Sequence, residues 1–196
     1  MFTNTLRSSL SFAVILGALF YSTLALAVPP IKVELGVVEV TDPVTLTVVD
    51  TLTVISNDKP CDGTAAGLSC IVVAKGNKPF IVFNLPDACK KDIDGNPVDG
   101  SPVYELIGMK IAQIKKDWPT PDNPLNKKIA SDFKADPETG EINFNYGENN
   151  RKPWKLKFKN RNNNAYSVFY KITAAPCDDE SNDPDITLDP EIRNRG

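Results

Sequence analysis

The chain has 196 residues, of which 24% are charged and 41% hydrophobic, with a formal net charge of −3 and no histidine. A nucleic-acid-binding domain is expected to be clearly basic, so this mild acidity argues against that class. The lack of histidine argues against Ser-His-Asp and Cys-His nucleophiles and against most transition-metal sites.

The N-terminus predicts a cleavable signal peptide over residues 1–27. Arg7 precedes the apolar run 12–20, and Ala25 and Ala27 provide the small residues of a cleavage site before Val28. This is the charged, apolar and small-residue order of a secretory signal, and the apolar run is too short for a membrane span. We therefore expect residues 28–196 to form one periplasmic or secreted domain, with no membrane span after cleavage.

Short runs in the first half of the chain, rich in valine, isoleucine, threonine and phenylalanine, predict strands joined by turns. Residues 31–37 alternate apolar and charged side chains, and residues 44–56 predict one or two further strands. Residues 71–74 and 79–85 predict a hairpin, because the Gly-Asn pair between them suits a tight reversal.

The second half continues the pattern. Residues 103–114 predict a long strand with a β-bulge at Gly108. Residues 116–128 are rich in proline and predict a surface excursion without regular structure. Residues 131–146 predict a strand, a turn at positions 136–140 and a returning strand.

The last third predicts further strands. Residues 153–161 place Trp154, Leu156 and Phe158 on one face and lysines on the other, and residues 165–173 follow after an Asn-rich turn. An acidic tail from about residue 178 to 196 ends in a short strand near residues 186–192. With about nine strands and no crossover helices, we expect an all-β fold, an antiparallel Greek-key β-sandwich of cupredoxin-like or immunoglobulin-like type.

Four cysteines, Cys61, Cys70, Cys89 and Cys177, predict two disulfides. An even number of cysteines in an exported chain favours disulfides, and zinc is disfavoured because the chain has neither histidine nor a C-x-x-C pair. Three pairings exist. Cys61 and Cys70 bracket a short polar segment that suits a local bridge, which leaves Cys89 to pair with Cys177.

A basic stripe along the strand at residues 153–161 is a candidate anion-binding surface. Its members are Arg151, Lys152, Lys155, Lys157, Lys159 and Arg161. Anionic polysaccharides and lipid headgroups are the ligands that such a stripe attracts. The alternative, which the sequence favours, is that lysines on an exposed strand prevent edge-to-edge aggregation.

Two aromatic residues, Trp118 and Tyr104, are candidates for a sugar-stacking platform. In a domain of this size, however, tryptophans are more often anchors of the core or of loops.

Two acidic segments are candidates for calcium. Asp94, Asn96 and Glu105 match positions 1, 3 and 12 of an EF-hand loop, but Val98 and Asp99 stand where an oxygen ligand and a glycine are required. We interpret this segment as a turn-rich loop. The acidic cluster at residues 178–185 is the second candidate, and a solvated tail is its simpler interpretation.

The segment WKLKFKNRNNNAYSVFYKIT, followed by Cys177 and LDPEIRN, resembles the C-terminal part of small exported bacterial β-sandwiches of cupredoxin-like topology. Cupredoxins hold copper through two histidines and a cysteine. Because this chain has no histidine, the resemblance implies the topology without a copper site, and topology does not fix function.

These observations predict a protein without a cofactor, a metal site or an assigned catalytic residue. We expect a non-catalytic binding or structural module, with an envelope protein or an anionic glycan as its partner. The alternative is a carboxylate-dependent glycan hydrolase, since paired carboxylates are the hydrolytic chemistry that remains without histidine. A pilus or adhesin subunit is a third option that would need a missing or donated strand.

Overall fold

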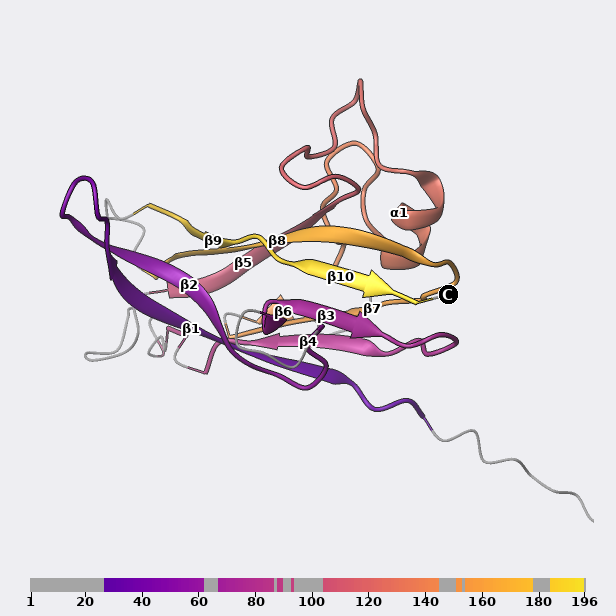
Figure 1. Ribbon diagram of the computed structural model, residues 1–196, viewed down its shortest axis with the longest axis horizontal. Helices are drawn as coiled ribbons and strands as arrows, with labels where there is room; N and C mark the ends of the chain where they lie inside the picture. The colour runs from indigo at the N-terminus through magenta and orange to yellow at the C-terminus, as the bar shows by residue number, and fades with distance from the viewer. Residues whose placement is uncertain are drawn as a thin grey trace, which may run out of the picture.

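The chain folds into two β-sheets that pack against each other, with one short helix beside them (Figure 1). The predicted all-β sandwich is confirmed. Apart from Ala27, the predicted signal peptide lies outside the described residues. The computed structural model describes residues 27–61, 67–86, 88–89, 93, 104–144, 151–152, 154–177 and 184–195.

The first sheet has five strands in the spatial order β2-β1-β4-β7-β6. In β1, Val33 and Leu35 are buried while Lys32 and Glu34 are exposed, as expected when one face of a strand covers a core. The strands of this sheet are β1 (Ile31–Thr41), β2 (Val48–Asn57), β4 (Phe80–Asn84), β6 (Arg151–Lys152) and β7 (Lys155–Lys159).

The second sheet has the order β3-β10-β8-β5, and β9 also pairs with β8. β9 and β10 follow one another along β8, and the N–H of Tyr170 donates to the carbonyl of Pro190 between them. The strand predicted near residues 186–192 is therefore two strands interrupted at a proline, which has no N–H to donate. The strands of this sheet are β3 (Cys70–Val73), β5 (Tyr104–Ala112), β8 (Tyr166–Pro176), β9 (Ile186–Leu188) and β10 (Glu191–Asn194).

Neighbouring strands run antiparallel except for one parallel pair in each sheet. β1 pairs with β4 in parallel, and β10 pairs with β3 in parallel. Each parallel pair joins segments that are not consecutive in the chain. Alternation of side chains shows which face a strand buries but not the direction of its neighbour, so the sequence did not reveal these two pairs.

β3 and β4 do not form the hairpin predicted for residues 71–85. β3 pairs in the second sheet and β4 in the first, so the turn at Lys75 and Gly76 carries the chain from one sheet to the other. Gly76 has a φ of 76°, in the left-handed region that glycine adopts readily. The prediction was wrong because turn residues mark a reversal without showing which sheet each arm joins.

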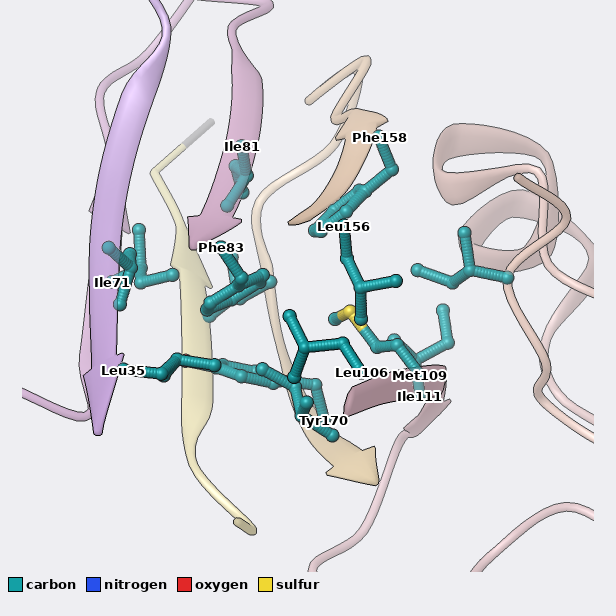
Figure 2. Packing of buried hydrophobic residues seen from close by; sticks show 14 of the residues in the cluster. Leu35, Ile71, Ile81, Phe83, Leu106, Met109, Ile111, Leu156, Phe158 and Tyr170 are labelled. Carbon is teal, nitrogen blue, oxygen red and sulfur yellow. The ribbon is translucent and has the colours of Figure 1, made fainter. Parts of the chain in front are cut away.

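The core between the sheets contains aromatic side chains from both of them. The ring centroid of Phe83 lies 6.2 Å from that of Phe158 and 5.2 Å from that of Tyr170. Leu35 and Leu106 pack around this group (Figure 2). The buried hydroxyl of Tyr170 donates to the carbonyl of Ser69, so its polar atom is satisfied.

Helix α1 (Lys127–Phe133) was not predicted, since residues 116–128 were expected to be irregular and residue 131 to begin a strand. The side chain of Asn126 caps the helix by accepting from the N–H of Lys128 at 2.9 Å. Ile129 and Phe133 are buried. Seven residues span too few turns to show helical periodicity in a sequence.

Two other local predictions in this region are confirmed. The register of β5 shifts between Leu106 and Gly108, which is the expected bulge. The turn at residues 136–140 is present, and Gly140 there has a φ of 71°. A Cβ on Gly140 would collide with the carbonyl oxygen of Ile111, so glycine is required at this close approach.

Trp154 does not share the buried face of β7 that the sequence predicted for it. Leu156 and Phe158 are buried, but the side chain of Trp154 is 46% exposed and the Nζ atom of Lys152 lies 5.2 Å from its ring centroid. The alternation begins with the strand at Lys155, so it does not extend back to Trp154.

Both predicted disulfides are present, Cys61 with Cys70 and Cys89 with Cys177. The second joins a residue after β4 in the first sheet to a residue after β8 in the second. Two disulfides are typical of a protein from an oxidising compartment. Within the described residues, no helix has the length and apolar character needed to cross a membrane.

Candidate functional site

The outer face of the first sheet carries the lysines of β7. Leu156 and Phe158 point into the core, so Lys155, Lys157 and Lys159 lie on the opposite face of the strand. In the ladder between β4 and β7, Lys159 pairs with Phe80. The basic stripe therefore runs beside an aromatic residue of the neighbouring strand.

Phe80 brings two of these lysines together. The Nζ atom of Lys157 lies 4.5 Å from the centroid of the Phe80 ring, and that of Lys159 lies 5.3 Å from it. A cation near an aromatic face is attracted by the negative face of the ring. Two ammonium groups are thus held near one ring although they repel each other, and an anion between them would relieve this repulsion.

A cavity of about 520 Å³ opens beside this pair, between β7, the β3–β4 connection and the end of α1. None of the described residues that line it carries a carboxylate. Its volume falls within the range of small-ligand sites. Five of the described residues that line it are basic, and we call it the basic pocket. These residues are Lys78, Lys134, Lys157, Lys159 and Arg161.

Most of this charge is not neutralised within the described part of the chain. The ion pairs Lys110–Glu141 and Arg193–Glu191 lie outside the basic pocket. No described carboxylate pairs with Lys157, Lys159 or Arg161. The pocket is therefore a concentrated positive site in a protein whose net charge is negative.

Asp132 of α1 anchors the loop that carries Arg161. The side chain of Asp132 is buried, and its carboxyl oxygens accept from the hydroxyl of Tyr166 at 2.8 Å and from the backbone N–H and side-chain amide of Asn163. The N–H of Arg161 donates to the Asp132 carbonyl at 3.1 Å. These bonds fix one wall of the basic pocket to the helix.

Asn160 and Asn162 attach the same loop to two other segments. The amide of Asn162 donates to the carbonyls of Ala74 and Asn77, next to Lys78 in the chain. The amide of Asn160 donates to the side chain of Asn194 in β10 at 2.7 Å. Asn162 has a φ of 43°, a left-handed conformation that asparagine tolerates. Side-chain hydrogen bonds therefore hold the basic residues of three segments in place.

Two tyrosines of β8 predict a loss of stability in alkaline solution. Burial is the main cause that raises the pKa of Tyr166 and Tyr170 above the ordinary 10.0, and the hydrogen bond to Asp132 raises that of Tyr166 further. The folded state keeps these protons after the unfolded chain has lost them, so their contribution is complete below the unfolded pKa and decreases above it. We expect the free energy of unfolding to fall as the pH rises beyond about 10.

Urea unfolding at about pH 8 and about pH 11 measures this decrease in the free energy of unfolding. The decrease should be smaller in Tyr166→Phe, which has one ionisable hydroxyl fewer. An unfolding free energy that stays constant across this interval would contradict the prediction.

The structure brings together part of the predicted basic stripe. Lys157, Lys159 and Arg161 line one pocket. Lys155 lies on the same strand but outside the described lining, and the side chain of Arg151 lies outside the described residues. The sequence missed Lys78, Lys134 and Phe80, which come from other segments.

Other predicted site residues do not join the basic pocket. Tyr104 is buried, so it offers no aromatic surface for a sugar and that interpretation was wrong. Trp118 is partly buried and does not line the pocket. Asp94 and Asn96 of the calcium hypothesis lie outside the described residues, as do residues 178–183 of the acidic cluster.

Comparison with known proteins adds no family assignment. No model of a known protein family matches the chain, and no curated protein matches it in sequence.

Proposed function

We propose that the protein is an exported, non-catalytic β-sandwich that binds an anionic glycan through the basic pocket. The observation that carries this proposal is the convergence of five cationic side chains on a cavity whose described lining has no carboxylate. Acidic sugars present carboxylate groups, for which guanidinium and ammonium groups are suitable donors. The glycan hydrolase alternative needs two carboxylates that face one cleft and are free to react. The described lining of this pocket supplies none, and the two carboxylates of a neighbouring cavity, Asp136 and Glu141, are held by backbone N–H groups and by Lys110.

The aggregation-blocking interpretation of the lysines predicts different behaviour from a binding site. Lysines that only protect a strand edge can be placed anywhere along it and need no partner residues from other elements. Here Lys78 and Lys134 approach from other segments, and hydrogen bonds of Asn162 and Asp132 tie those segments to the loop after β7. This arrangement supports a preorganised site.

Neutralising the lysine pair on Phe80 tests the proposal. We expect the double variant Lys157→Gln/Lys159→Gln to bind polygalacturonate at least about tenfold more weakly than the wild type, because both ammonium groups at the ring are lost. Neutral dextran should not bind to either protein. Biolayer interferometry at about 50 mM salt, where screening is modest, gives the affinities.

A matched control separates the site from the general charge of the protein. Lys127→Gln/Lys128→Gln removes the same charge from two exposed positions of α1 that do not line the pocket. We expect this control to change the affinity by less than about twofold. Equal losses in both double variants, or no binding of polygalacturonate by the wild type, would refute the proposed site.

A further inference from the structure

A second cavity adjoins the basic pocket. It has a volume of about 400 Å³ and shares Lys134, Asn143 and Arg161 with the basic pocket. Beyond these residues it is lined by small and polar side chains, including Ser131 of α1. Because the two cavities share these lining residues, they lie side by side at Arg161 and the end of α1.

A third cavity continues from the second. It has a volume of about 490 Å³ and shares Asp136 and Asn143 with the second cavity. Its far side is formed by the bulge of β5 at Gly108. The three cavities therefore lie next to one another, and we call this series the furrow; it runs from the basic pocket around residues 134–143 to Gly108.

The charge along the furrow changes sign. Among the described residues, the basic pocket has five cations, whereas the lining of the distal end has Asp136, Glu141 and one lysine, Lys110. Lys110 pairs with Glu141 at 3.2 Å. Backbone N–H groups of Thr139 and Glu138 lower the pKa of Asp136, so its carboxylate is ionised at neutral pH. A ligand with a negative charge on every unit would be repelled at the distal end.

The middle of the furrow suits uncharged polar groups. Asn143 lines all three cavities, and Ser131 lies beside it in the second. Amide and hydroxyl groups donate and accept hydrogen bonds, as sugar hydroxyls do. Gly108 leaves the distal end open, since a Cβ built on it meets no atom within 4 Å.

We propose that the furrow binds a sparsely charged acidic oligosaccharide, with its acidic sugar in the basic pocket and neutral sugars extending toward Gly108. This inference rests on the proposed function and adds to it the length and charge spacing of the ligand. It predicts that affinity grows with neutral sugars attached to one acidic sugar, and that further acidic sugars reduce the gain.

Three soluble probes separate these contributions in calorimetric titrations of the wild-type protein. They are glucuronic acid, aldotetrauronic acid (one glucuronic acid on three xyloses) and tetragalacturonic acid. We expect aldotetrauronic acid to bind at least about tenfold more tightly than glucuronic acid, and more tightly than tetragalacturonic acid despite its lower charge.

Two variants locate the distal contacts. Gly108→Leu places a side chain in the open end of the furrow. It should weaken the binding of aldotetrauronic acid about fivefold or more and leave the binding of glucuronic acid unchanged. Gln113→Leu, at an exposed position just after β5 and outside the described lining of the furrow, adds the same side chain as a control. Glu141→Gln should strengthen the binding of tetragalacturonic acid but not that of the other two probes, because it removes a carboxylate that repels the additional acidic sugars.

The outcomes distinguish the two proposals. If none of the probes binds to the wild type, the proposed function and the furrow both fail. If glucuronic acid and the longer probes bind with one affinity, or if Gly108→Leu changes nothing, the basic pocket stands and the extended site is overturned. Tighter binding of tetragalacturonic acid than of aldotetrauronic acid also overturns it.

Discussion

Replacing Cys89 and Cys177 together by alanine is expected to lower the free energy of unfolding by about 4–5 kcal/mol. The bond closes a loop with a sequence separation of 88, so its loss returns a large conformational freedom to the unfolded chain. Both cysteines are buried. Urea unfolding followed by circular dichroism measures the change, which is comparable to the whole stability of many domains.

The other disulfide provides the comparison. Cys61 and Cys70 have a sequence separation of 9, so Cys61→Ala/Cys70→Ala should cost about 2–3 kcal/mol in the same measurement. Equal losses for the two double variants would contradict the loop-length argument. A loss of less than about 1 kcal/mol for the Cys89 and Cys177 pair would show that the bond contributes little to the fold.

Asp132→Ala is the single substitution for which we expect the largest loss, about 3 kcal/mol. The side chain of Asp132 is 2% exposed and accepts hydrogen bonds from Asn163, Asn164 and Tyr166. Alanine leaves these donors without their acceptor and releases the loop that carries Arg161. We therefore expect binding to the basic pocket to weaken together with stability.

Two further variants test this explanation. Asp132→Asn keeps one oxygen acceptor and should lose about half as much stability as alanine. Asp122→Ala removes an exposed aspartate from the proline-rich segment and should stay within about 0.5 kcal/mol of the wild type. The hydrogen-bond explanation fails if Asp132→Ala is as stable as Asp122→Ala.

The strands could be predicted because their alternation is local, whereas their arrangement is not. Residues 31–37 and Leu156 with Phe158 show the period of two that a half-buried strand requires. β3 and β4 lie in different sheets because β3 pairs with β10 and β4 pairs with β1, and these partner strands are far away in the chain. Cupredoxin-like topology, export and the partner remain predictions.

The candidate site was predictable in its linear part. Lys157, Lys159 and Arg161 stand at alternate positions of one segment, so the sequence places them on one side of the chain. Lys78 and Lys134 reach the pocket from a crossover turn and from the end of a helix that was not predicted. Asp132, which holds these parts together, was hidden because nothing in the sequence distinguishes a buried aspartate from an exposed one.

The order of the disulfides has a consequence for biosynthesis. The bonds join the first cysteine to the second and the third to the fourth, Cys61 to Cys70 and Cys89 to Cys177. If the cysteines are oxidised in the order in which they are synthesised, Cys61 and Cys70 pair before Cys89 is available. Cys177 is then the one thiol left with which Cys89 can pair. Native connectivity therefore needs no reshuffling of bonds, and maturation should proceed in cells that possess a thiol oxidase but lack a disulfide isomerase.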